Sequence, residues 1–69
     1  MRRSTIEQYL YRHFDGLQVV PIEWAFYHLQ ASRDDEKILK QELREQLHEP
    51  RCPAFIDKRF AVKFIVQHL

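Results

Sequence analysis

The C-terminal segment Ala54–Leu69, AFIDKRFAVKFIVQHL, decides between two folds for this chain. Every second position in its latter half carries an aromatic or β-branched residue, in the order Phe60, Val62, Phe64 and Val66. This two-residue period is typical of a β-strand. The stretch Ala54–Ile56 could pair with that strand across a turn at Asp57 and Lys58. We therefore predict a C-terminal β-hairpin.

A helix that begins at Pro53 is the alternative for the same segment. Arg59, Lys63 and Gln67 would then form a narrow polar stripe, because they recur at a spacing of four. The turn of the hairpin would contain neither glycine nor asparagine, which weakens the hairpin prediction. Short apolar runs are ambiguous by periodicity alone, so the helix stays open although the alternation favours the hairpin.

Two short helices are predicted in the N-terminal half. Ser4 and Glu7 have the spacing of a capping box, which places the first helix at about Thr5–Phe14. Proline suits the first turn of a helix, so a second helix is predicted at about Pro21–Gln30. The stretch between them, Leu17–Val20, is β-prone and forms a short strand or a linker.

A third helix is predicted at 33–48, with Ser32 as its N-cap and Asp35 three residues further on. At about 100° per residue, Leu39, Leu43 and Leu47 form its apolar stripe. A second face is mostly basic and comprises Arg33, Lys37, Lys40, Gln41, Arg44 and His48. A third face is mostly acidic and comprises Asp34, Asp35, Ile38, Glu42, Glu45 and Glu49. This separation of charge by sign is the sequence feature that indicates a functional surface.

Length and composition predict a single domain over residues 1–69. The chain is 45% apolar and 30% charged with a net charge of +1, which suits a globular protein rather than a disordered one. A domain this small has a thin core, so a homodimer or a protein partner is a reasonable expectation. The single cysteine, Cys52, permits no intramolecular disulfide and suggests the reducing cytoplasm. No apolar run is long enough for a membrane span, and no internal repeat is apparent.

The sequence provides no pattern for catalysis, a cofactor or a metal site. No nucleophile stands with an oriented base, and there is no glycine-rich phosphate loop. His48 and Cys52 are four residues apart, but Pro50 between them breaks the helix that would align the pair. We expect a protein that is not an enzyme and that holds no metal or cofactor.

The order helix, extended piece, helix, tight joint, helix and hairpin resembles the winged helix-turn-helix class of DNA-binding domains. The resemblance covers nearly the whole chain as a pattern of elements. It implies a small α+β fold of three helices plus a C-terminal β-hairpin; the alternative is an all-α four-helix bundle. It also implies that the third helix enters the major groove and that the hairpin, or wing (54–66), touches the DNA backbone. The implied DNA contacts are Arg33, Lys37, Lys40, Gln41, Arg44, Lys58, Arg59 and Lys63.

Two functions follow as hypotheses. The first is a small DNA-binding transcriptional regulator or accessory factor that contacts double-stranded DNA. The second is a protein-interaction module, an adaptor or inhibitor, that uses Trp24, Tyr27 and His28 or the acidic face of the third helix. These three residues lie off the apolar stripe of the second helix, and burial between the first helix and the C-terminal segment is their alternative role. The predicted core is Ile6, Tyr9, Leu10, Phe14, Ile22, Phe26, Leu29, Leu39, Leu43, Leu47, Phe60, Val62, Phe64 and Val66.

Overall fold

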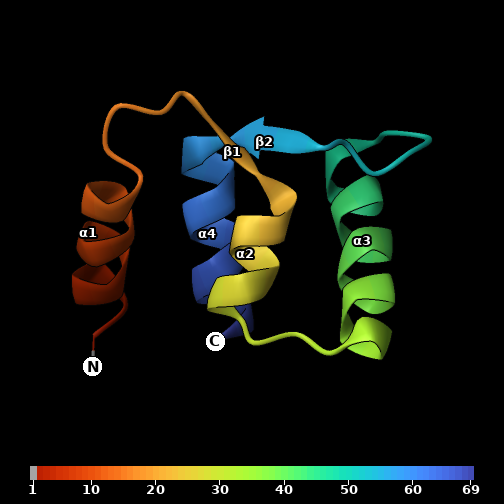
Figure 1. The fold of residues 1–69 in the computed structure, drawn as a ribbon, viewed down its shortest axis with the longest axis horizontal. Helices are drawn as coiled ribbons and strands as arrows, with labels where there is room; N and C mark the ends of the chain where they lie inside the picture. The colour runs from red at the N-terminus through yellow and green to blue at the C-terminus, as the bar shows by residue number, and fades with distance from the viewer. Residues whose placement is uncertain (1) are drawn as a thin grey trace.

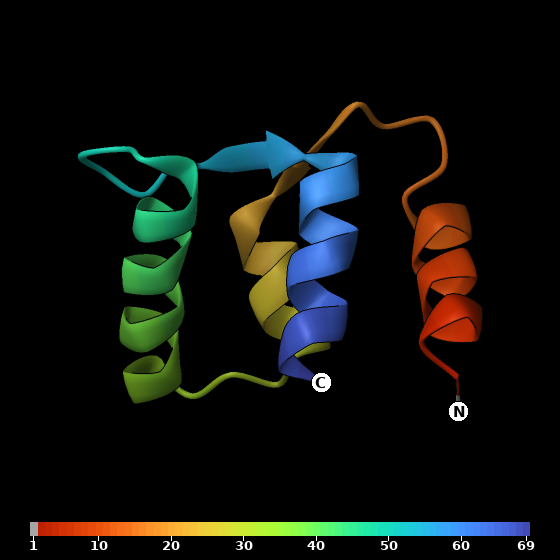
Figure 2. The same ribbon diagram turned by 180° about the vertical axis from the view of Figure 1, so that it is seen from behind.

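A computed structural model describes residues 2–69, and within that range it contains four helices and one two-stranded sheet (Figure 1). The elements are α1 (Arg3–His13), β1 (Val19–Pro21), α2 (Ile22–His28), α3 (Arg33–Leu47), β2 (Phe55–Asp57) and α4 (Lys58–His68). Helices α1 and α3 stand on either side of the α2 and α4 pair, with α2 in front in Figure 1 and α4 in front from behind (Figure 2). The two strands cross one end of the helices.

The predicted C-terminal hairpin is wrong, because residues 58–68 form the helix α4. Apolar residues at odd as well as even positions are buried, as a helix allows and a one-sided strand does not: Ala61, Val62, Phe64, Ile65 and Val66. The exposed positions are Arg59, Lys63 and Gln67, the stripe that the alternative prediction recognised. Asp57 caps the start of this helix, because its carboxylate accepts a hydrogen bond from the Arg59 backbone N–H at 2.9 Å. The all-α alternative has the right number of helices but lacks the sheet.

The sheet joins two segments that are far apart in the sequence. Strands β1 and β2 are antiparallel, and Val20 pairs with Ile56 at the centre of the ladder. Both of these side chains are buried. The ladder continues past the strand ends, since the Lys58 N–H donates to the Gln18 carbonyl and the Ile22 N–H donates to the Ala54 carbonyl, each at 3.0 Å. The β-prone stretch Leu17–Val20 is therefore only partly strand, and its partner is β2 rather than a wing.

The sheet also exposes an approximate internal repeat that the sequence does not make apparent. Each strand leads directly into a helix, β1 into α2 and β2 into α4. Since antiparallel pairing at Val20 and Ile56 relates the two halves, residue n of the first unit corresponds to residue n + 36 of the second. Ala25 on α2 and Ala61 on α4 correspond in this way, and both are fully buried. The two helices also pack on each other.

Of the two N-terminal caps predicted from the sequence, the structure confirms one and contradicts the other. The Ser32 cap of α3 is confirmed: its Oγ accepts from the Asp35 N–H at 3.1 Å, and the Asp35 carboxylate accepts from the Ser32 N–H at 3.2 Å. The predicted capping box of Ser4 and Glu7 is wrong, because α1 already begins at Arg3 and has no side-chain cap. Helix α3 ends at Leu47, one residue before the predicted end.

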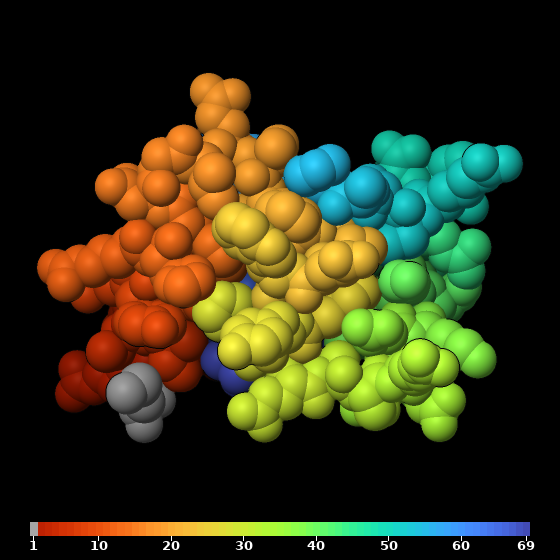
Figure 3. Space-filling view, in the orientation of Figure 1, coloured from red at the N-terminus to blue at the C-terminus, as the bar shows by residue number. Residues whose placement is uncertain are grey.

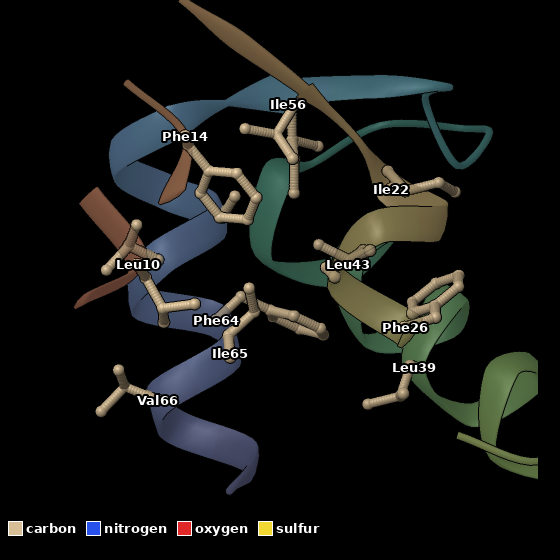
Figure 4. Close-up of a cluster of buried hydrophobic side chains, with 14 residues drawn as sticks. Leu10, Phe14, Ile22, Phe26, Leu39, Leu43, Ile56, Phe64, Ile65 and Val66 are labelled. Atoms are coloured by element: carbon tan, nitrogen blue, oxygen red, sulfur yellow. The ribbon is translucent and has the colours of Figure 1, made fainter. Parts of the chain in front are cut away.

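One hydrophobic core lies among the helices beneath the sheet (Figure 4). Nine predicted core residues are buried, namely Leu10, Phe14, Ile22, Phe26, Leu39, Leu43, Val62, Phe64 and Val66. Four others pack on its edge and are only partly buried: Ile6, Leu29, Leu47 and Phe60. The helical spacing of Tyr9 predicts a core position, and this prediction is wrong, because Tyr9 is 61% exposed. The core also takes in residues that were not predicted, among them Val20, Ile56, Ala61 and Ile65.

Candidate functional site

Five ring-bearing side chains gather where α1 and α2 adjoin. Figure 3 shows the regions of these two helices next to each other on one face of the molecule. Helix α1 contributes Tyr9 and His13, and helix α2 contributes Trp24, Tyr27 and His28. We call these five residues the aromatic surface. Tyr27 is 81% exposed and Trp24 is 45% exposed, which is unusual for such large rings in a domain with so little core. The surface is thus available for contact with another molecule.

Ring contacts hold the aromatic surface in a defined shape. The His13 and His28 rings meet edge to face with centroids 4.9 Å apart, and they link α1 to α2. Phe14 is fully buried beneath them, with its ring centroid 5.6 Å from His28 and 6.3 Å from Trp24. These distances are those of favourable aromatic pairs. A cavity of about 360 Å³ opens between His13, Trp24, Tyr27 and His28.

The chemistry of this cavity is mostly apolar at neutral pH. Burial, and to a smaller extent the neighbouring His13, lowers the pKa of His28 below its ordinary value of 6.5. His28 is therefore uncharged at neutral pH, and its ring nitrogens act as one donor and one acceptor. The Tyr27 hydroxyl adds a further polar group. An apolar cavity with a few hydrogen-bonding groups is the usual character of a binding site.

The sequence left two alternatives for Trp24, Tyr27 and His28, an exposed interaction surface or burial between neighbouring elements, and the structure bears on the second. Trp24 and Tyr27 are exposed and His28 is half-buried, so burial of all three between neighbouring elements is wrong. Sequence reasoning missed Tyr9 and His13 as members of the same surface. The available signal was their i, i+4 spacing, which puts both rings on one side of α1.

The basic and acidic faces of α3 point to opposite sides of the molecule. Lys40 lies with Glu23 in a groove beside α2. Glu42 faces α4, where its Oε2 lies 3.1 Å from His68 Nε2. Beside α3, helix α2 lies on the front of the molecule in Figure 1, and helix α4 lies on the back, which faces the viewer in Figure 2. The basic face therefore opens toward α2 and the acidic face toward α4.

The predicted DNA contacts do not form one surface. On α3, Arg33, Lys37, Lys40 and Gln41 are exposed and Arg44 is half-buried. The residues assigned to the wing lie on α4, where Arg59 and Lys63 are exposed and Lys58 is half-buried at the helix start. Because α3 turns its basic face toward α2, the exposed basic stripe of α4 is not continuous with it.

Metal-ligand residues are scattered over the part of the chain that the structure describes. Within residues 2–69, no group of three or more His, Cys, Asp or Glu side chains lies close enough to hold a metal ion. The loops 14–18 and 48–54 join a helix to a strand, as a calcium-binding helix–loop–helix does, but each contains one carboxylate where that motif needs several. Cys52 is half-buried, and burial raises the pKa of its thiol above its usual value. It therefore lacks the thiolate character of a reactive cysteine.

Comparison with known proteins identifies no relative of this chain. No protein family matches the sequence, and no significant match was found among curated proteins or solved structures. None of the helices in residues 2–69 is long and apolar enough to cross a membrane.

Proposed function

We propose that this chain is a non-enzymatic protein-interaction module of the reducing cytoplasm and that it binds its partner through the aromatic surface. One observation carries the proposal: Tyr27 is 81% exposed beside a cavity that is walled by His13, Trp24 and His28. Tyrosine and tryptophan are the residues that most often dominate binding energy at protein interfaces. A partner side chain inserted into this cavity would bury exposed surface of both Tyr27 and Trp24.

The construction of the surface also favours binding. Phe14 supports the rings of Trp24 and His28 from beneath, and α2 is anchored by its packing on α4. The Trp24 and His28 rings thus lose little conformational freedom when a partner binds, so less of the interaction free energy is spent on ordering them. Rigid rings that present area at low entropy cost are typical of engineered and natural binding surfaces.

Loss of either exposed ring is expected to weaken partner capture. Trp24→Ala and Tyr27→Ala should each raise the Kd by about thirty-fold, since hot-spot truncations cost about 2 kcal/mol or more. Tagged wild type and variants would be used to capture partners from cell extract. The Kd of the captured protein, purified, would then be measured by calorimetry.

Ile38→Ala provides the matched control, because Ile38 is 66% exposed on α3 and lies outside the aromatic surface. It removes exposed apolar area from another face and should leave the Kd unchanged. If the three variants capture the same proteins with the same affinity as the wild type, the aromatic surface is not the binding site. A wild type that forms dimers by light scattering, and Tyr27→Ala that stays monomeric, would identify a second copy as the partner.

DNA binding through α3 is a second candidate, which one observation favours. Arg33, Lys37 and Lys40 are exposed, and the only ion pair within 4.0 Å in residues 2–69 joins Glu42 to His68 instead. Cations without a protein partner remain free to contact phosphates. The absence of a wing leaves α3 as the sole DNA-contacting element of this proposal.

If α3 binds duplex DNA, Lys37→Glu with Arg44→Glu should reduce the affinity by about ten-fold or more at low salt. The matched control is Arg59→Glu with Lys63→Glu, which makes the same charge change on α4 and should have the smaller effect. Gel retardation of a short duplex over a salt series measures both. A wild type that fails to retard DNA at low salt would rule this candidate out.

A further inference from the structure

The approximate two-fold relation between the halves allows the contact of α1 with α4 to be compared with that of α3 with α2. Helix α1 packs directly on α4. By the two-fold relation α3 should pack on α2 in the same way, but within residues 2–69 the backbone of α3 makes no comparably close approach to another helix. Figure 3 shows α2 at the front of the molecule between the α1 and α3 regions. Leu39 and Leu43 of α3 still reach the core with their side chains, and a groove lies beside α2 and α3 on the surface.

The groove beside α2 and α3 has a partly polar lining. It has a volume of about 430 Å³ and is lined by Glu23, Phe26, Tyr27, Gln30, Ala31 and Glu36. We name this feature the α2–α3 groove.

Two carboxylates line this groove, and neither has a cation of residues 2–69 within the ion-pair distance of 4.0 Å. Glu36 on α3 has Lys40 four residues further on, the spacing of a helical ion pair. Glu36 and Lys40 do not form that pair. Within residues 2–69, only Glu42 and His68 lie within the ion-pair distance of 4.0 Å. Glu23 on α2 is exposed and likewise unpaired in the described chain. Lys40 lies beyond Glu23 in the adjoining part of the front face, so the acidic stretch ends there.

Tyr27 joins the α2–α3 groove to the aromatic cavity, since its side chain lines both. Tyr27 thus lines the same groove as Glu23 and Glu36, and it lines the same cavity as Trp24 and the two histidines. A tyrosine ring beside carboxylates is a favourable place for a lysine or arginine side chain, which can contact the ring face and the negative charges together. The neighbouring cavity suits a bulky apolar side chain.

We propose that the α2–α3 groove binds a lysine or arginine of the partner protein while the adjoining aromatic cavity binds a bulky apolar residue of the same segment. The inference rests on the proposed function and names the chemistry of the partner. Charge complementarity selects a basic segment over an acidic one, because like charges in a desolvated groove repel. The partner is therefore another protein that presents a basic residue next to an apolar one.

Short capped Gly/Ser peptides that carry one Leu and one Arg at varied spacings are the probes, and the same peptides with Glu for Arg are the controls. Amide shifts of the ¹⁵N-labelled protein would be followed by NMR at millimolar peptide. The Arg peptides should move the signals of Glu23, Tyr27 and Glu36, and the Glu peptides should not. Glu23→Gln with Glu36→Gln should weaken the binding of the Arg peptide about five-fold, as two partly exposed ion pairs allow.

A matched pair of variants separates a local effect from a change in net charge. Asp34→Asn with Glu45→Gln removes the same charge from the exposed outer side of α3 and should leave peptide affinity unchanged. Equal weakening by both charge pairs, or equal binding of Arg and Glu peptides, would overturn the proposal.

Two further outcomes separate this inference from the proposed function. If Trp24→Ala abolishes peptide binding while Glu23→Gln with Glu36→Gln does not change it, the groove inference fails and the aromatic surface stands. If Trp24→Ala has no effect while the Arg peptide still shifts Glu23 and Glu36, the proposed function fails and with it the pairing of the two pockets. A diffusion coefficient that falls with protein concentration would make a second copy the occupant and overturn the proposal.

Discussion

Phe64→Ala is expected to leave about half of the protein or more unfolded at 25 °C. Phe64 is 1% exposed, and its ring lies 6.3 Å from Phe60 and 4.5 Å from His68 between ring centroids. Truncation of a buried phenylalanine costs about 3–5 kcal/mol. A core as small as this one supplies a net stability of about 3–5 kcal/mol, so the loss is comparable to the whole. Urea unfolding followed by circular dichroism measures the change.

Phe55→Ala is the control for that experiment, because Phe55 is 58% exposed on β2. It removes the same ring from the surface and should cost less than about 1 kcal/mol. A Phe64→Ala protein with the urea midpoint of the wild type would show that α4 does not contribute its ring to the core. The two variants together therefore test the placement of α4 as well as the stability of the domain.

The sequence predicts the helices well where a local signal is strong. Helix α3 has both a capping box at Ser32 and an apolar stripe at Leu39 and Leu43, and its observed bounds differ from the predicted ones by one residue. Helices α1 and α2 are also present near their predicted positions. In each case residues close in the chain determine the structure, so a single sequence contains the needed information.

The sheet could not be predicted in the same way. Strands β1 and β2 are three residues each, too short for a periodic signal, and they pair over 36 residues between Val20 and Ile56. That pairing depends on how all four helices pack. The C-terminal segment failed for a related reason: its two-residue alternation arises because α4 is buried on most of its circumference, which leaves only a narrow polar stripe.

The aromatic surface was predicted in part for a different reason. Trp24 and Tyr27 fall off the apolar stripe of α2, which identifies them as surface candidates from the sequence. Their meeting with Tyr9 and His13 requires that α1 lie beside α2, and this arrangement is set by the packing of both helices on α4. The α2–α3 groove was out of reach for the same reason, since it depends on the position of α3.

Lys63→Pro is expected to destabilise the domain by about 3 kcal/mol or more, because it places proline inside α4. Proline removes the N–H that donates to the carbonyl four residues earlier, and its ring clashes with that carbonyl. Lys63 is exposed, so no buried contact is lost and the effect reports on the backbone alone. Lys63→Ala is the control: it removes the same side chain from a helix and should change stability by less than about 0.5 kcal/mol. In a wing hairpin, proline on an exposed edge strand would leave a three-helix core intact. Thermal unfolding of the two variants separates these cases, and equal melting temperatures would contradict a helix at 58–68.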